Sequence, residues 1–354
     1  MHCVVQRLAQ GFAERSRIFI KATSMPTPDW PTASARLNLR TPDGHCLHVR
    51  QCGPENGEPW LVLHGGPGSG CSPSMAAWFD PLRHRAVLPD QRGAGRSRPA
   101  GSGRRNTVTA LLADLEQLRT TLGIERWGVV GGSWGAALAL AYADRFPHAV
   151  STLVLRGTFL TGFDDVQALF NARGAGRDLL RGTGGRSEGF PAARGRLLAV
   201  TDMLQLGTTV QKLNIATAWQ RAERRLLGLR AQAHRQSRPQ QMALMRKYRL
   251  QAHYLYRRAG LGKSALLRAA ARIGARGLPV TLLHGREDKV CRPENALRLS
   301  TAMPQARLVW VPAGHLAQGE MARALGAAIR DAAWSVGVSG QTAGLVDPAV
   351  DRVA

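Results

Sequence analysis

The sequence lacks any long apolar run. No hydrophobic stretch approaches the roughly 18 residues that a helix needs to cross a bilayer, although hydrophobic residues make up 44% of the 354-residue chain. This composition is ordinary for a globular protein and allows a sizeable core. We therefore expect no membrane-spanning segment and no membrane partner. The length fits one large α/β domain with an insertion, or two domains.

Cysteine is also scarce. The five cysteines form no C-x-x-C pair, and an odd number argues against a secreted disulfide framework. No zinc-finger spacing is found either. These absences favour a reducing, cytoplasmic location.

Acidic residues are few, because 24 Asp and Glu face 48 Lys and Arg, giving a formal net charge of +24. Such a balance raises the possibility of a nucleic-acid partner. However, the arginines are spread along the chain, and no RNA-binding motif with interleaved aromatic residues is found. We expect no specific nucleic-acid partner, and a non-enzymatic basic protein that binds nucleic acid stays open as an alternative.

The most informative stretch is residues 129–138. A Val-rich run ends in Gly131-Gly132, Ser133 follows, and an Ala/Leu-rich run continues to about Arg145. This pattern predicts a buried strand, a sharp turn and a helix, which is the setting of a Gly-x-Ser-x-Gly nucleophile elbow. We predict that Ser133 is a nucleophile. The alternative is a tight structural turn that contains a serine.

A glycine-rich loop follows an earlier predicted strand at residues 59–64. The loop reads Gly65-Gly66-Pro67-Gly68-Ser69-Gly70, and its two interpretations are a phosphate cradle and an oxyanion hole. It lacks the Lys-Ser/Thr ending of a P-loop. We therefore predict an oxyanion hole made by the N–H groups of Trp134 and Gly66, with Gly65 as the second choice for the loop donor.

Alternating strand and helix patterns predict the fold. Residues 37–40 and 47–50 form a hairpin across Asp43-Gly44, and an amphipathic helix is expected over residues 107–122. Further strands are expected at 86–90, 151–156, 278–284 and 307–311. This order predicts an α/β protein with a mostly parallel sheet and helices on both faces. At the end of the strand over 86–90, Asp90 and Arg92 are expected to form a buried ion pair. The alternative is a catalytic role for them.

An all-helical insertion interrupts the strand pattern. We divide the chain into a disordered N-terminal extension (1–35), a first core part (36–158), a helical cap (159–277), a second core part (278–334) and a disordered tail (335–354). Within the cap, helices are expected over 210–229 and 240–258, and a glycine-rich loop over 174–196. Such an insertion suits a lid over an active site, and the alternative is a separate helical module.

A nucleophilic serine needs an imidazole base and an acid that orients it. Of the ten histidines, His315 sits in a glycine-preceded loop directly after a late strand, whereas His64 and His284 suit packing or loop hydrogen bonds. Asp288 follows another strand and precedes His315, in the order Ser, Asp, His. Glu287 is the rival acid. The predicted triad is Ser133, Asp288 and His315.

With these residues in view, the chain resembles the proline iminopeptidases, which are prolyl aminopeptidases of the α/β-hydrolase superfamily. The resemblance runs from about Arg36 to Trp334. The motifs that carry it are His64–Gly68, Asp90–Ser97, Gly131–Gly135, Leu155–Leu160, His284–Cys291 and Gly314-His315. It implies an α/β-hydrolase fold with an inserted helical cap. It also implies a serine aminopeptidase that releases N-terminal proline from small peptides through an acyl-enzyme, without a metal or a cofactor.

The resemblance also implies residues that bind substrate. The family's Trp-x-x-Trp-Glu pattern is similar to residues 219–223, so Glu223 is expected to hold the substrate amine. The alternative for Glu223 is an ordinary ion pair with nearby arginines. A second pattern, Arg-x-Glu-x-His-Tyr-Phe, is similar to residues 249–255, in which the glutamate is Gln251 and the last aromatic is Leu255. The positions that match the family's proline pocket are Phe159, Trp134, Val290 and Cys291. The alternative function is an esterase or amidase on the same scaffold.

Overall fold

The computed structural model describes residues 35–162, 164–166, 193–230, 236–256 and 261–338. Its centre is an eight-stranded sheet of order β1-β2-β4-β3-β5-β6-β7-β8. The strands are β1 (Ala35–Arg40), β2 (Cys46–Cys52), β3 (Glu58–Leu63), β4 (His84–Pro89), β5 (Trp127–Gly132), β6 (Val150–Arg156), β7 (Val280–Gly285) and β8 (Arg307–Val311). β2 runs antiparallel to β1 and β4, and the remaining neighbours are parallel. The predicted mostly parallel sheet is confirmed.

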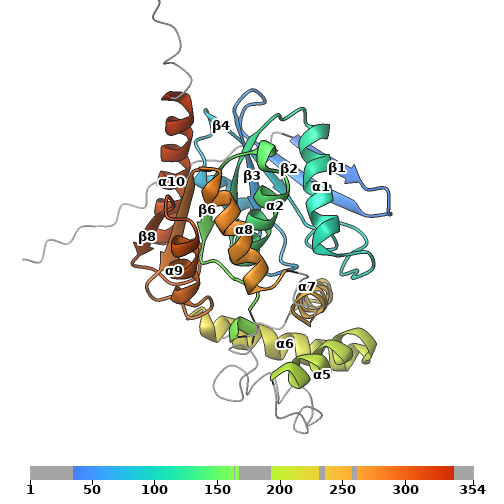
Figure 1. The fold of residues 1–354 in the computed structure, drawn as a ribbon. Coiled ribbons are helices and arrows are strands. Elements are labelled where there is room, and N and C mark those ends of the chain that lie inside the picture. The colour runs from blue at the N-terminus through green and yellow to red at the C-terminus, as the bar shows by residue number, and fades with distance from the viewer. Residues whose placement is uncertain (1–34, 163, 167–192, 231–235, 257–260, 339–354) are drawn as a thin grey trace, which may run out of the picture. The chain divides into compact units, whose positions relative to one another are not determined.

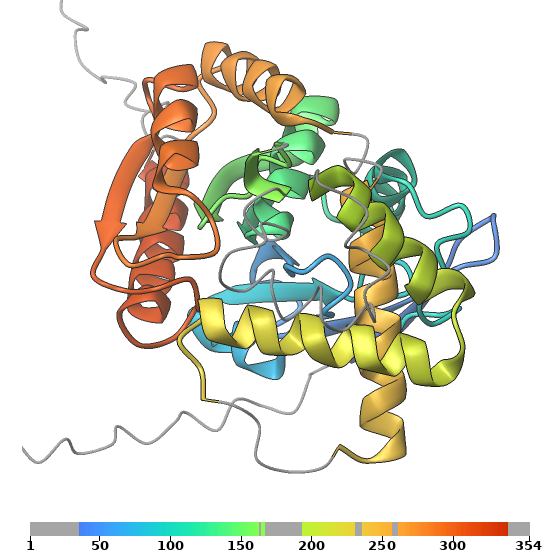
Figure 2. The same cartoon turned by 90° about the horizontal axis from the view of Figure 1, so that it is seen from below.

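Helices cover both faces of this sheet (Figures 1 and 2). They are α1 (Val108–Thr121), α2 (Trp134–Arg145), α8 (Lys263–Ala275), α9 (Pro293–Ala302) and α10 (Gly319–Val338), with short 3₁₀ turns η1 (Pro73–Trp78) and η2 (Pro147–Ala149). The predicted helix over 107–122 is α1, and the Thr107 side chain caps it by accepting from the Ala110 N–H at 3.2 Å. Ser, Thr, Asp and Asn are favoured at this position because they satisfy a free N–H of the first turn.

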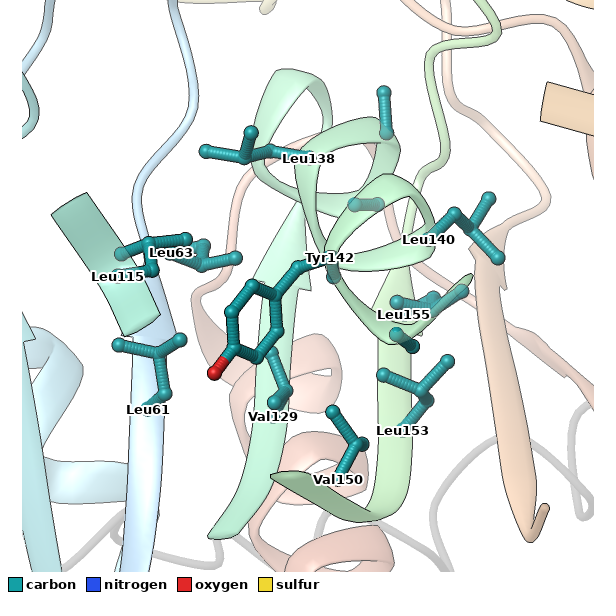
Figure 3. Packing of buried hydrophobic residues seen from close by; sticks show 14 of the residues in the cluster. Leu61, Leu63, Leu115, Val129, Leu138, Leu140, Tyr142, Val150, Leu153 and Leu155 are labelled. Carbon is teal, nitrogen blue, oxygen red and sulfur yellow. The ribbon is translucent and has the colours of Figure 1, made fainter. Parts of the chain in front are cut away.

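The central helix α2 is apolar along nearly its whole length, because it is buried on most sides. Figure 3 shows Leu138, Leu140 and Tyr142 of α2 among side chains of β3, β5 and β6. The Tyr142 hydroxyl donates to Glu116 of α1 at 2.8 Å, so the one polar atom of this ring is satisfied. Burial of apolar surface is the main favourable term in folding, and close packing fixes the position of α2 against the sheet.

Alternate residues of the strands contribute to the packing on opposite faces of the sheet. Leu61, Leu63 and Val129 belong to the core cluster under α1, α2 and α8, whereas their buried neighbours Trp60 and Val62 do not. Successive side chains of a strand point to opposite faces. The second face is covered by α10, which contacts β6, β7 and η1.

Of the helices described between β6 and β7, three lie at one end of the sheet (Figure 1). They are α5 (Ala193–Leu206), α6 (Thr209–Leu226) and α7 (Arg238–Tyr256). Their apolar side chains form a second cluster that includes Trp219 and Tyr248, whose rings stack with centroids 5.1 Å apart. Helix α8 falls within the predicted cap range 159–277, but Leu266 and Ile273 of α8 pack into the core cluster with α2. The cap therefore ends before α8.

Two further boundaries differ from the sequence-based expectation. The predicted loop over 174–196 lies largely outside the described residues, but its last residues, from Ala193 on, begin α5. The predicted tail begins at residue 335, but α10 continues to Val338. The remainder of the tail, and the N-terminal extension up to residue 34, lie outside the described residues, whereas Ala35 opens β1. Within the described ranges, no helix is both long enough and apolar enough to span a bilayer.

Candidate active site

The turn between β5 and α2 holds Ser133 in a strained conformation. Its φ is 57° and its ψ is −119°, a left-handed backbone that L-residues rarely adopt. The flanking glycines make this turn possible. A Cβ on Gly131 would lie 2.4 Å from the Gly135 carbonyl oxygen, and one on Gly135 would lie 2.1 Å from the Leu63 carbonyl oxygen. Only glycine fits at both positions, which is the geometry expected of a nucleophile elbow.

Asp288 and His315 form a hydrogen-bonded pair beside this turn. The His315 Nδ1–Asp288 Oδ2 distance is 2.8 Å. The other carboxylate oxygen, Oδ1, accepts from the backbone N–H groups of Val290 and Cys291 at 2.8 and 2.9 Å. Burial alone raises the pKa of Asp288, but its bonds to His315 and to these N–H groups outweigh burial and lower that pKa. The rival acid, Glu287, is exposed.

The surroundings of His315 lower its pKa and so favour the neutral imidazole. Burial lowers its pKa below the ordinary 6.5, and the nearby Arg156 guanidinium lowers it further, while the hydrogen bond to Asp288 opposes both. Arg156 also donates from Nη1 to the His315 carbonyl oxygen. Because Asp288 accepts the proton on Nδ1, the Nε2 atom is left without a proton and can act as a base.

Ser133 and His315 line the same cavity, which has a volume of about 270 Å³. Between these two described residues there is no hydrogen bond, and Ser133 Oγ instead lies 3.8 Å from the Cys291 Sγ atom. Such contacts are often long in unliganded enzymes and shorten when substrate binds. The structure thus brings the three predicted triad residues to one place, with the acid–base contact formed and the base–nucleophile contact open.

Gly65 and Gly66 line the same cavity, and Gly65 approaches Ser133 most closely, since a Cβ on it would lie 3.5 Å from the Ser133 Cβ. Among the described residues, the backbone N–H groups of Gly66 and Trp134 have no acceptor. Gln91 holds the two predicted donor segments together. Its side chain donates to the His64 carbonyl oxygen and accepts from Trp134 Nε1, both at 2.9 Å.

The polar residues near this loop only partly match expectation. His64 makes loop hydrogen bonds, as expected, because its Nδ1 lies 2.9 Å from the Gly65 carbonyl oxygen and its Nε2 lies 3.0 Å from the Gln91 nitrogen. The predicted Asp90–Arg92 ion pair is wrong. Asp90 accepts from the backbone N–H groups of Cys71 and Arg96, at 2.7 and 2.8 Å.

The ion pairs of Arg92 are made instead with two carboxylates distant in sequence. Its guanidinium binds Asp114 of α1 and Asp43 of the β1–β2 turn, with nearest distances of 2.5 Å. Pairing across such separations cannot be read from neighbouring residues. Asp90 therefore shapes the glycine-rich turn, and Arg92 joins the first hairpin to α1.

The cap also contributes to the lining of this cavity. Phe159, Val290 and Cys291 form apolar wall on the core side, and the Trp134 side chain, also predicted there, is fully buried and does not line the cavity. From the cap come Glu223 and Leu226 of α6, the following Leu227, and three residues of α7. These three residues are Lys247, Gln251 and Leu255. Their spacing of four places them on one face of the helix.

Glu223 is enclosed by hydrogen-bond donors. Its Oε2 accepts from Lys247 Nζ at 2.9 Å and from the Tyr248 hydroxyl at 2.8 Å, and its Oε1 accepts from Gln251 Nε2 at 2.6 Å. Burial opposes its ionisation, but Lys247 and these bonds outweigh burial, so the pKa of Glu223 lies below its usual value. Among the described residues its ion-pair partner is Lys247, whereas the alternative interpretation named arginines.

The sequence contains two signals for these contacts. Lys247 lies four residues before Gln251, so any helix that aims Gln251 at the site also aims Lys247 there. Trp219 lies four residues before Glu223, and its stacking on Tyr248 sets the register of α6 against α7. Arg156 and Gln91 both lie within sequence motifs, but no neighbouring residue indicates which partners they contact. In the described part of the chain, no group of three or more His, Cys, Asp or Glu side chains could hold a metal ion.

Comparison with known proteins agrees with this architecture. The family model for the alpha/beta hydrolase fold matches residues 59–322. A hydrolase from Pseudomonas aeruginosa PA01 is similar in structure, with a TM-score of 0.52 and 19% identity over 85% of this chain and 99% of that one. An esterase from Exiguobacterium antarcticum has a TM-score of 0.51 and 18% identity, covering 87% and 100%. The fold is therefore that of the α/β hydrolases, and the predicted fold class is confirmed.

Relatives with higher identity define the family more closely. The chain is 35% identical to a proline iminopeptidase of Xylella fastidiosa over 78% of this chain and 88% of that protein. It is 36% identical to one from Neisseria gonorrhoeae, covering 83% and 94%, and 34% identical to one from Arabidopsis thaliana, covering 84% and 79%. The chain belongs to the proline iminopeptidase family, as its motifs predicted.

Proposed function

We propose that this chain is a serine aminopeptidase that releases proline from the N-terminus of small peptides through an acyl-enzyme. The names of its relatives support this activity. The observation that carries the proposal is that one cavity is lined both by Ser133 and by Glu223. A substrate with a reactive carbonyl close to a cationic nitrogen matches both residues.

Acylation begins at Ser133. Its Oγ forms a bond to the prolyl carbonyl carbon as His315 Nε2 takes its proton, and Asp288 stabilises the imidazolium that results. The carbonyl oxygen becomes an oxyanion, which the N–H groups of Trp134 and Gly66 stabilise, with Gly65 as the alternative donor. When the C–N bond breaks, His315 returns the proton to the leaving amine, and a prolyl ester of Ser133 remains.

Deacylation repeats these roles with water. His315 takes a proton from a water molecule, whose oxygen attacks the ester carbonyl carbon. The intermediate collapses, His315 protonates Ser133 Oγ, and free proline leaves. No step in this scheme calls for a metal or a cofactor.

Substrate binding depends on the pairing of donors with acceptors at the cap. An N-terminal proline carries a secondary ammonium with two N–H donors. In the unliganded protein Glu223 accepts from three donors, one of them Lys247, and a carboxylate can accept about four hydrogen bonds. The Gln251 Oε1 atom is buried and has no partner among the described residues. We assign the two donors to these two acceptors, and the pyrrolidine ring to the wall formed by Phe159, Val290 and Cys291.

Glu223→Ala tests the proposal. We expect a loss of about 100-fold in kcat/KM for proline-β-naphthylamide, because an ammonium would lose its counter-charge. Hydrolysis of a p-nitrophenyl ester that lacks an amine should change little. Equal losses on both substrates would remove the amine-binding role and favour the esterase or amidase alternative. Labelling of wild-type Ser133 by a serine-reactive probe, with protection by a prolyl peptide, checks the nucleophile separately.

The cysteines bear on the proposed location. All four cysteines in the described ranges are free, including the buried Cys52 and Cys291. Free thiols are usual in a reducing compartment. They support the cytoplasmic location that we propose for this enzyme.

A further inference from the structure

The amine end of the cavity contains a cation of its own. The Lys247 Nζ atom lies 2.9 Å from the Glu223 Oε2 atom and 4.6 Å from the centroid of the Tyr248 ring. A hydrogen-bonded lysine of this kind contributes the same type of interaction that a substrate ammonium would make. In the unliganded protein, therefore, the place of a cationic ligand is taken by a side chain.

The charges that line the cavity make the contact between Lys247 and Glu223 important. Glu223 is the only carboxylate among the described lining residues, whereas Lys247 and Arg156 are both cations. With Lys247 paired, the amine end is close to electroneutral. A substrate ammonium that enters would lie beside Lys247, and like charges at short distance in a partly buried site repel each other strongly.

We propose that Lys247 is a specificity-determining residue that competes with the substrate amine for Glu223, so that substrate binding requires the lysine to move away. This inference rests on the proposed function of Glu223. Its consequence is a site in which amine affinity is held down by an internal counter-ion, and in which loss of that ion tightens amine binding.

The surroundings of Lys247 allow such a movement. Its side chain is 28% exposed, against 20% for Glu223, so the lysine is only partly buried. Lys247 and Ser69 also line a second cavity of about 390 Å³, where three glutamines supply polar lining (Gln220, Gln236 and Gln240). A flexible four-carbon stem can carry the charge from Glu223 towards that space.

Calorimetric titration measures the competition without turnover. In a Ser133→Ala background, L-prolinamide supplies the cationic ligand and N-acetyl-L-prolinamide its uncharged counterpart. We expect Lys247→Met to lower the Kd of L-prolinamide about tenfold and to leave the Kd of the uncharged ligand unchanged. Lys247→Arg keeps the charge and should not tighten binding. The matched control is Arg246→Met, which removes a neighbouring charge that lines only the second cavity.

A Kd for L-prolinamide that rises or stays the same in Lys247→Met would overturn the inference, since it would mean that the lysine only holds Glu223 in position. Equal tightening in Arg246→Met would overturn it as well, because a general charge effect would then suffice. In Glu223→Gln the Lys247→Met change should lose its effect. Failure of the proposed function is seen separately, as the absence of proline release by the wild-type enzyme from proline-β-naphthylamide.

Discussion

The two ends of the cavity are built in different ways. At the reacting end, backbone geometry sets the positions, since Ser133 sits in a left-handed turn between obligatory glycines and Asp288 is held by two backbone N–H groups. At the amine end, side chains of α6 and α7 hold one another, with Glu223 at the centre. A backbone-based centre tolerates little change, whereas a cross-helix cluster can change its charge without altering the fold. The reacting end therefore determines the chemistry, and the amine end determines the substrate specificity.

Asp288→Asn should give the largest effect and should act on the reacting end alone. An asparagine can present its NH₂ group to His315 and favour the wrong tautomer, so we expect kcat to fall about 10⁴-fold. The loss should be the same for proline-β-naphthylamide and for an ester without an amine. Steady-state kinetics on both substrates measure it.

Glu287→Gln is the matched control for that variant. It removes the neighbouring, exposed carboxylate and should leave kcat within about twofold, as is usual for surface substitutions away from special contacts. A much larger loss on the prolyl substrate than on the ester, in Asp288→Asn, would contradict the division between the two ends. Thermal unfolding of both variants checks that the fold is retained.

This contrast also explains which parts of the site the sequence could predict. The elbow was predictable because steric demand leaves a local mark, since a Cβ at Gly131 or Gly135 would overlap a carbonyl oxygen. The order of strands and helices was predictable for a similar reason, because burial on one face imposes a period on the sequence. His315 and Asp288 followed from their places after strands, since the carboxyl ends of parallel strands meet at one edge of a sheet.

Contacts between residues far apart in sequence were harder to predict. Arg92 was expected beside Asp90, but its partners lie on α1 and in the first hairpin. The helical spacing of Lys247 and Gln251 places them on one face, but the pairing of Lys247 with Glu223 depends on the packing of α6 on α7. The packing of α8 was hard to predict for the same reason, because α8 has an ordinary amphipathic pattern and only its tertiary contacts place it against the core.

Gln251→Met sharpens the comparison from the amine end. The change keeps the approximate size of the side chain but removes the unpartnered Oε1 acceptor and the donor to Glu223. We expect KM for proline-β-naphthylamide to rise about fivefold, the usual effect of one lost hydrogen bond, with kcat little changed. Gln240→Met, on the same helix but outside the active cavity, is the control. An equal rise in KM for an ester without an amine would count against an amine-binding role for Gln251.

The smallest expected effect links the two ends through charge. The base must be neutral to accept a proton, so kcat/KM should fall as the pH drops through the pKa of His315. That pKa lies below 6.5, because burial and Arg156 outweigh the hydrogen bond to Asp288. The Glu223 carboxylate acts in the opposite sense and raises it. Glu223→Gln should therefore move the acid limb of the profile to lower pH, measured on an ester without an amine so that substrate binding does not interfere. A limb centred above pH 6.5 in the wild type, or one that moves to higher pH in the variant, would mean that His315 is not the group that titrates.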